Sequence, residues 1–286
     1  MSHAVTTIEL KAIKKRGQKV TMMTAYDYTT ARLVDEAGVD SILVGDSLGM
    51  TMLGYETTLQ VTMDDMIHHT RAVVRGTKKA LVIGDMPFLS YHTSADDAVR
   101  NAGRFIQEAG AKAVKLEGCK NVEGALKAIL RAEIPVLGHL GLTPQSVNRL
   151  GGFKVQGRDE AAARLLLEES LLLQEWGVFG IVLECVPSPV AQWVSSQLDI
   201  PTIGIGAGAG CDGQVLVIQD ALGMNRDFTP RFVKQFDTLG DRTVEAVRRY
   251  CEEVQQGIFP GEEHTFSVES DVVDRLYGGG TNRLEV

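Results

Sequence analysis

The run ALVIGDM, residues 80–86, decides the fold, because it is a continuous apolar stretch that ends on an acidic side chain, Asp85. A run without strict alternation is typical of a strand covered on both faces, as in a parallel sheet. Seven more runs of this kind are separated by longer segments of helical period: VTMMTAY (20–26), SILVGD (41–46), AKAVKLE (111–117), IPVLGHL (134–140), VFGIVLE (178–184), PTIGIGA (201–207) and QVLVIQD (214–220). The alternation predicts repeated βαβ units.

The segments between the runs predict helices over residues 31–37, 62–75, 95–109, 122–131, 160–176 and 190–198. Several of these segments end on a glycine that suits a left-handed helix C-cap: Gly38, Gly76, Gly110 and Gly177. Residues 230–254 are expected to supply the closing helices, and residues 8–15 a short helix over one end. Eight runs favour an α/β fold, the (β/α)8 TIM barrel with a short N-terminal capping helix, over an open doubly wound sheet.

The length of 286 residues fits one such barrel, since barrels run to about 250 residues as a single unit. We expect a catalytic domain over residues 1–266 and a loosely attached C-terminal tail over 267–286. Residues 48–60 and 141–158 follow strand ends and are rich in glycine and threonine. These two segments are candidate lids over a site.

Composition excludes several classes of protein. The net charge of −8 and the scattered Lys and Arg residues argue against nucleic-acid binding, which needs a basic patch. No apolar stretch has the length of a signal peptide or approaches the roughly 20 residues that span a bilayer. Four cysteines without a C-x-x-C pair suggest neither a disulfide framework nor a thiolate metal site. We therefore expect a cytoplasmic protein that acts on small molecules without membrane contact.

The ends of the predicted strands carry the candidate chemistry, because active sites of such barrels lie at the C-terminal ends of the strands. Ionisable groups at or next to the ends of five of the runs are the candidates: Asp46 followed by Ser47, Asp85, Lys115 with Glu117, His139, and Glu184. Asp46, Asp85 and Glu117 offer oxygen ligands only, which suits Mg²⁺ holding waters or substrate oxygens. Each aspartate taken singly could equally be a helix N-cap, but the recurrence on neighbouring strands favours a cation site.

The remaining ionisable strand ends allow two interpretations each. Lys115 and Glu117 are two residues apart and face the same side of a strand, so they could form a salt bridge or serve a site, with Lys115 holding an anionic group. Glu184 ends a very apolar run, and a carboxylate in apolar surroundings suits a general base for a weakly acidic C–H. His139 is either a satisfied core histidine or a secondary substrate contact.

Longer segments surround these strand ends. They include VGDSLGM (44–50), GDMPF (84–88), VKLEG (114–118), GHLGLTPQSV (138–147), GGFKVQGR (151–158), LECVP (183–187) and FPGEEHTF (259–266). In amino-acid sequence and in their order along the chain, these segments resemble those of the ketopantoate hydroxymethyltransferase family. The resemblance covers almost the whole chain, and only the tail after Phe266 looks additional.

The resemblance implies an activity and a cofactor. The reaction would transfer a hydroxymethyl group from 5,10-methylenetetrahydrofolate to 3-methyl-2-oxobutanoate (α-ketoisovalerate), giving 2-dehydropantoate (ketopantoate) in pantothenate and coenzyme A biosynthesis. It implies one Mg²⁺ per subunit and a homo-oligomer, a decamer of barrels. By the same resemblance the metal ligands are Asp46, Asp85 and a further, water-mediated Glu117, the substrate-binding positions include Ser47 and Lys115, and the catalytic base is Glu184.

This mechanism agrees with the chemistry of the strand ends. A 2-oxo acid can chelate Mg²⁺, and the ion would stabilise the enolate that forms when Glu184 removes the C3 proton. One alternative is a Mg²⁺-dependent carbon–carbon lyase or mutase of the phosphoenolpyruvate mutase and isocitrate lyase type. Such enzymes usually need a loop cysteine, and residues 86–94, MPFLSYHTS, contain none. The second alternative is a non-catalytic barrel that binds a metabolite. Such a protein would be expected to have lost one of the acidic residues at the strand ends, and this chain retains them. No motif marks a folate site.

Overall fold

The computed structural model describes residues 4–152 and 154–277 and divides the chain into two compact units, Met1–Asp237 and Thr238–Val286. The first unit contains a closed barrel of eight parallel strands in sequence order. The strands are β1 (Val20–Thr24), β2 (Ser41–Val44), β3 (Leu81–Asp85), β4 (Ala113–Glu117), β5 (Val136–Gly141), β6 (Gly180–Glu184), β7 (Thr202–Ile205) and β8 (Gly213–Leu216). The predicted TIM barrel is confirmed.

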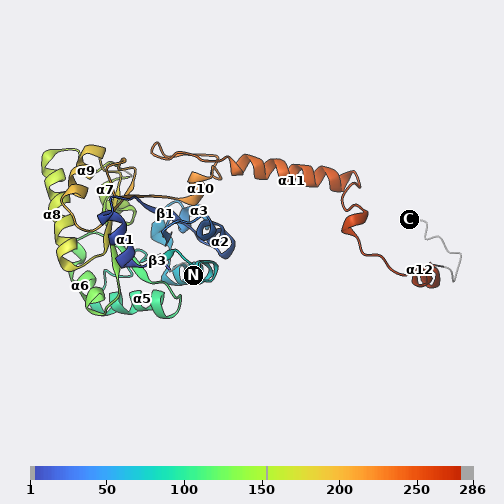
Figure 1. Cartoon of the computed structure of the whole chain (residues 1–286), viewed down its shortest axis with the longest axis horizontal. Helices are drawn as coiled ribbons and strands as arrows, with labels where there is room; N and C mark the ends of the chain where they lie inside the picture. The colour runs from blue at the N-terminus through green and yellow to red at the C-terminus, as the bar shows by residue number, and fades with distance from the viewer. Residues whose placement is uncertain (1–3, 153, 278–286) are drawn as a thin grey trace. The chain divides into compact units, whose positions relative to one another are not determined.

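Six helices connect the strands as the sequence predicted. They are α2 (Tyr28–Glu36), α4 (Met63–Gly76), α5 (Ala95–Gln107), α6 (Glu123–Arg131), α8 (Glu160–Trp176) and α9 (Ser188–Ser196). Figure 1 shows helices of this unit, such as α5, α6 and α8, on the outside of the barrel. Several begin at a side chain that accepts a hydrogen bond from the backbone N–H three residues later, as Asp27 does from Thr30 at 2.9 Å. At α4 the caps are reciprocal, since Thr62 and Asp65 each accept from the other's backbone N–H.

The N-terminal helix α1 (Thr7–Lys15) closes one end of the barrel. Leu10 and Ile13 are buried in the same apolar cluster as the inward-facing residues of the strands. The Lys14 ammonium donates to the carbonyl oxygens of Ser195 and Ile200, each at 3.0 Å. Both of these residues precede β7, so α1 covers the N-terminal ends of the strands, and the expected capping helix is confirmed.

Side-chain alternation inside the barrel positions the site. Leu81 and Ile83 of β3 face the interior apolar cluster, so the next inward position on that strand is Asp85. The same period carries β5 from Leu137 to His139 and β6 from Val182 to Glu184. The strands therefore present an apolar plug toward α1 and ionisable groups toward their C-terminal ends, where loops can build a site.

Gly76 differs from its expected role. Gly38, Gly110 and Gly177 have φ values of +87°, +80° and +107°, as left-handed positions after a helix require. Gly76 is instead the last residue of α4, with Thr77 as the C-cap. A Cβ at Gly76 would lie 2.5 Å from the carbonyl oxygen of Tyr28. Its small size therefore allows α4 to pack closely against α2.

The end of the barrel sequence also differs from expectation. The run at 214–220 ends as a strand at Leu216, and α10 (Ile218–Ala221) follows it. The helices expected over residues 230–254 are only partly formed: residues 230–237 belong to the first unit and form no helix, and α11 (Leu239–Gln255) lies in the second unit and buries none of its residues. Its apolar side chains, among them Val244, Val247 and Tyr250, are exposed. The second unit also contains the short helix α12 (Ser270–Tyr277).

The expected boundary between a catalytic domain and a C-terminal tail at residue 266 stays a prediction. It differs from the boundary between the two compact units, which lies after Asp237. Within the expected tail, residues 278–286 lie outside the described residues, as does Phe153 in the segment 141–158. That segment contains two short helices, η3 (Pro144–Ser146) and α7 (Val147–Leu150). In the described parts of the chain, every helix is too short or too polar to cross a membrane.

Candidate active site

The ionisable strand ends meet in one cavity of about 170 Å³, here called the acid cavity. Its lining includes all of the side chains singled out from the sequence: Asp46, Ser47, Asp85, Lys115, Glu117, His139 and Glu184. Strand register brings them together, because Asp85 lies opposite Lys115 and Glu117 lies opposite His139. Residues far apart in the chain are thereby placed side by side at the C-terminal end of the barrel.

Lys115 and Asp85 form the central ion pair of the acid cavity. The Lys115 Nζ atom lies 2.6 Å from Oδ1 and 2.7 Å from Oδ2 of Asp85. Burial lowers the pKa of Lys115, but the charges of Asp85, Glu117 and Asp46 outweigh it and raise the pKa above its ordinary value. Lys115 is therefore positively charged. Both interpretations offered by the sequence apply to it, because Lys115 forms a salt bridge with Asp85 and also lines the acid cavity.

Asp46 follows β2 and is buried beside Asp85. Its backbone N–H donates to Asp85 Oδ2 at 3.2 Å, and its own Oδ2 accepts from the Gln145 side chain at 2.8 Å. Burial and the neighbouring charge of Asp85 raise the pKa of Asp46 well above its usual range. A divalent cation between these two carboxylates would relieve both effects, so the pair fits an oxygen-ligated metal.

The donor set fits Mg²⁺ better than zinc. Of the residues that line the acid cavity, only His139 offers ring nitrogens and none is a cysteine, whereas zinc sites usually combine several Cys or His ligands. Mg²⁺ is often held by one or two carboxylates and completes its shell with water and substrate oxygens. Glu117 Oε1 is buried and accepts no well-aligned hydrogen bond among the described residues, although His139 Nδ1 lies 3.3 Å from it. This oxygen could accept from a metal-bound water.

His139 bridges two carboxylates that the sequence treated separately. Its Nδ1 lies 3.3 Å from Glu117 Oε1 and its Nε2 lies 3.3 Å from Glu184 Oε2. Burial and Lys115 lower the pKa of His139, but the two carboxylates outweigh them and raise it to about 9. His139 is thus an imidazolium near neutral pH, and Glu184 does not lie in the purely apolar surroundings that the sequence suggested.

Ser47 is oriented by a buried tyrosine. Its Oγ lies 2.8 Å from the hydroxyl oxygen of Tyr26, and burial raises the pKa of that phenol to about 12. A Cβ at Gly45 would lie 2.8 Å from Ser47 Oγ. The small Gly45 therefore leaves room for the Ser47 hydroxyl to line the acid cavity.

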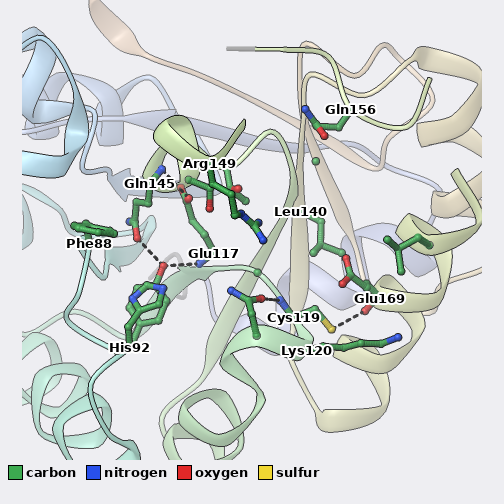
Figure 2. Close-up of a pocket in the computed structure, with 17 residues that line it drawn as sticks. Phe88, His92, Glu117, Cys119, Lys120, Leu140, Gln145, Arg149, Gln156 and Glu169 are labelled. Carbon is green, nitrogen blue, oxygen red and sulfur yellow. Dashed lines mark hydrogen bonds between the residues drawn. The ribbon is translucent and has the colours of Figure 1, made fainter. Parts of the chain in front are cut away.

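The sequence alone did not identify Gln145 and Tyr91 as residues of the site. The Tyr91 hydroxyl donates to Gln145 Oε1 at 2.6 Å and accepts from the Glu117 backbone N–H at 3.2 Å. The Gln145 backbone N–H donates to Glu117 Oε2 at 3.1 Å, and Figure 2 shows Gln145 beside Glu117. Gln145 thereby connects Asp46 to Glu117. Neutral side chains in loops give no charge pattern, and only the position of Gln145 after a strand end could have drawn notice.

A closed parallel barrel with buried carboxylates and a lysine at its C-terminal strand ends defines a (β/α)8-barrel enzyme. Phosphonopyruvate hydrolase, solved in complex with oxalate and Mg⁺⁺, has a similar structure, with a TM-score of 0.60, 14% sequence identity, and 96% of this chain and 95% of that chain covered. A structure of 2,3-dimethylmalate lyase, a member of the phosphoenolpyruvate mutase/isocitrate lyase superfamily, matches with a TM-score of 0.58 at 15% identity over 95% of this chain and 94% of that one. Both similarities concern the fold alone.

The family follows from sequence similarity. The model of the ketopantoate hydroxymethyltransferase family matches residues 4–262, and the chain belongs to this family. The 3-methyl-2-oxobutanoate hydroxymethyltransferase of Clostridium botulinum (strain 657 / Type Ba4) is 57% identical over 277 residues, which cover 97% of this chain and 100% of the relative. The enzyme of the same name from Syntrophomonas wolfei is 60% identical over 273 residues, 96% of this chain and 99% of the relative.

Proposed function

We propose that this protein transfers a hydroxymethyl group from 5,10-methylenetetrahydrofolate to 3-methyl-2-oxobutanoate and so forms 2-dehydropantoate. The proposal rests on one observation in a member of this family. The ammonium of Lys115, the neighbouring aspartates Asp46 and Asp85, and the separate carboxylate of Glu184 line the same acid cavity of about 170 Å³. A small oxo acid needs these groups to bind its carboxylate and to lose a C3 proton.

Glu184 is the proposed base. It lies at the end of β6, and its Oε2 is held 3.3 Å from the imidazolium of His139. A held carboxylate oxygen can take the C3 proton. Water would cleave the two C–N bonds of the methylene bridge of the folate donor, releasing tetrahydrofolate and a one-carbon unit at the formaldehyde level. The enolate carbon would bond to that carbon, and the water oxygen, once protonated, would become the new hydroxyl group. The Lys115 ammonium would pair with the substrate carboxylate, and Ser47 would orient the substrate by a hydrogen bond.

Asp46 and Asp85 are the proposed ligands of one Mg²⁺ per subunit, with Glu117 acting through water. Bound Mg²⁺ would polarise the keto oxygen and stabilise the negative charge that develops there. In the structure Lys115 occupies both oxygens of Asp85. Lys115 therefore neutralises Asp85, and it would pair with the substrate carboxylate if a bound Mg²⁺ took over that charge.

The test is exchange of the C3 proton of 3-methyl-2-oxobutanoate with deuterated solvent, followed by NMR without folate. We expect exchange that requires both the protein and Mg²⁺, because proton removal precedes carbon–carbon bond formation. A lyase or mutase of the phosphoenolpyruvate mutase type would cleave or rearrange its substrate without this exchange. A metabolite-binding barrel would give none. Absence of Mg²⁺-dependent exchange would overturn the proposal.

We also propose that the protein is a cytoplasmic homo-oligomer, a decamer by family resemblance. Exposed apolar side chains at helical spacing on α11 support an association surface, since isolated helices are unstable without packing: Val244, Val247, Tyr250 and Val254. Light scattering is expected to give a mass of several chains at micromolar concentration. A Val247→Glu variant should dissociate, whereas Glu245→Gln on the same helix should not.

The catalytic domain is proposed to end at residue 266. A chain that stops there keeps α11 and the family's matched region, which ends at residue 262. Its steady-state activity is expected to equal that of the full chain. Loss of activity on removal of residues 267–286 would give the tail a catalytic or assembly role.

A further inference from the structure

A second, larger cavity of about 410 Å³ adjoins the acid cavity. We call it the aromatic pocket (Figure 2). Glu117 lines both cavities, and Gln145, whose amide donates to Asp46, lines the aromatic pocket as well. The aromatic pocket is thus separated from the proposed reacting centre by two side chains that belong to the acid cavity's own hydrogen-bond network.

One side of the aromatic pocket is built from flat rings. The ring centroids of Tyr91 and His92 are 4.2 Å apart, and those of Phe88 and His92 are 6.0 Å apart. Burial lowers the pKa of His92, which keeps this imidazole neutral near pH 7. A row of neutral rings is a surface on which a planar heteroaromatic ligand can stack.

The opposite side of the aromatic pocket is part apolar and part acidic. Figure 2 places Leu140 and Glu169 across the space from Phe88 and His92, and Leu165 of α8 also lines it. Burial raises the pKa of Glu169, so a ligand that donates hydrogen bonds to this carboxylate would favour its ionised form. Amino and amide N–H groups on the edge of a heteroaromatic ring are such donors.

Two cations line the aromatic pocket. Arg149 of α7 is exposed and lines the pocket together with Lys120. Lys120 also pairs with Glu168 at 2.7 Å across exposed side chains, a contact that a ligand could replace. A guanidinium at this position can form paired hydrogen bonds with a carboxylate. The pocket therefore combines stacking rings, an acid for N–H donors, and cations for an anionic tail.

We infer that the aromatic pocket binds the one-carbon donor, a reduced pterin with an anionic glutamate tail. The pterin would stack on the rings nearest Glu117, and the tail would leave past Arg149. The inference rests on the proposed function, because only a folate-dependent transfer needs a donor of this chemistry beside the acid cavity. It adds the site that no sequence motif marks, with Leu165, Arg149 and Glu169 as residues that select the donor.

The test measures binding of tetrahydrofolate, the product form of the donor, by titration calorimetry. Leu165→Glu introduces a negative charge into the pocket from a position that is 48% exposed, so folding should be preserved. Its Kd for tetrahydrofolate is expected to rise by about tenfold or more. Arg149→Ala should raise the Kd by about tenfold through loss of a charged hydrogen bond to the tail.

Matched controls lie on α8. Leu171→Glu changes an equally apolar residue that is 40% exposed and lies outside the lining of the aromatic pocket. Arg164→Ala removes an arginine that pairs with Glu160 at 2.8 Å on the helix surface. Both controls are expected to bind tetrahydrofolate as the unaltered protein does, and binding of 3-methyl-2-oxobutanoate with Mg²⁺ checks that every variant is folded.

The outcomes separate this inference from the proposed function. Unchanged tetrahydrofolate affinity in both Leu165→Glu and Arg149→Ala, with normal oxo acid binding, would overturn the site while leaving Mg²⁺-dependent C3 exchange intact. Failure of exchange in the unaltered protein would instead overturn the proposed function. If Leu165→Glu also loses oxo acid binding, the exposed Arg149→Ala variant alone decides the site.

Discussion

Lys115 holds both carboxylate oxygens of Asp85, with its Nζ 2.6 Å from Oδ1 and 2.7 Å from Oδ2. The two side chains are 5% and 2% exposed, so water contributes little to either charge. Three acids, Asp85, Glu117 and Asp46, raise the pKa of Lys115 together. The acid cavity is therefore a charged cluster whose stability depends on one lysine.

Replacement of Lys115 by Met is expected to destabilise the metal-free protein by about 3–5 kcal/mol, because it leaves buried carboxylates without their cation. Urea unfolding in EDTA measures the change. Arg164→Met serves as the control, since its ion pair with Glu160 joins side chains that are 69% and 79% exposed; such a pair contributes about 1 kcal/mol or less. Equal stability of the two variants would contradict the central role of Lys115.

Asp85→Asn is expected to weaken Mg²⁺ binding by at least about tenfold. Mutation of residues that only hydrogen-bond to a metal ligand already lowers metal affinity by about 10- to 100-fold, and Asp85 is proposed as a ligand itself. Titration calorimetry with Mg²⁺ and the oxo acid measures the effect. Asp97→Asn in the first turn of α5 is the control, because that side chain pairs with exposed Arg100 at 3.1 Å and does not line the acid cavity. Unchanged affinity in Asp85→Asn would remove this residue from the metal ligands.

Glu184→Gln is expected to lower the rate of C3 proton exchange by about 10²- to 10⁴-fold, the usual contribution of a general base. The amide is isosteric and can remain beside His139 Nε2, which lies 3.3 Å from the carboxylate. Binding of 3-methyl-2-oxobutanoate with Mg²⁺ should therefore persist in calorimetry. Near-normal exchange would assign proton removal to another group.

Asp35 provides a pH-dependent contribution to stability. Its carboxylate accepts from the backbone N–H groups of Lys78, Lys79 and Ala80 at 3.0, 2.9 and 2.7 Å. Burial raises the pKa of Asp35, but these three hydrogen bonds outweigh it and lower the pKa below its ordinary 3.8. The carboxylate thereby anchors the chain where it enters β3.

Because the folded pKa of Asp35 is lowered, its contribution is complete above pH 3.8 and is lost as the pH falls through the lowered value. Asp35→Asn should cost about 1.5–3 kcal/mol at pH 7, as expected for hydrogen bonds to a charged group. The difference from the unaltered protein should shrink in urea unfolding below pH 3.8. Asp64→Asn, at a side chain that is 85% exposed, should change stability by less than about 1 kcal/mol. A pH-independent difference for Asp35→Asn would exclude this account.

Gly84 of β3 has no room for a side chain. A Cβ there would collide with the ring of Phe105, which packs from α5. Gly84→Ala is therefore expected to destabilise the barrel by about 1–3 kcal/mol. Gly103→Ala, within α5 and with open space around it, should stabilise by about 0.5–1 kcal/mol through helix propensity. Thermal unfolding compares the two, and a stabilised Gly84→Ala variant would contradict the packing argument.

Phosphonopyruvate hydrolase and 2,3-dimethylmalate lyase share the barrel at 14% and 15% identity. At that distance the similarity extends to the fold, in which substrates of many kinds can be accommodated by the loops. The loop at 86–94 lacks cysteine and supplies Phe88, Tyr91 and His92 to the aromatic pocket.

The sequence by itself determined the eight strands, the helices between most of them, and the ionisable residues at the strand ends. These features are local, because continuous apolar runs and the helical period are read from neighbouring residues, and alternation alone carries β3 from Ile83 to Asp85. The sequence did not determine that α11 belongs to the second unit, because a helical pattern gives no information about what a helix packs against.

Only the tertiary structure decided which ionisable groups meet. Closure of the barrel sets the register that places Lys115 opposite Asp85 and Glu117 opposite His139. It also inserts Gln145 between Asp46 and Glu117, which are far from each other in the chain. Charge interactions depend on distance and burial, and both are properties of the closed barrel. The sequence named the acids of the site, and the fold selected the partner of each.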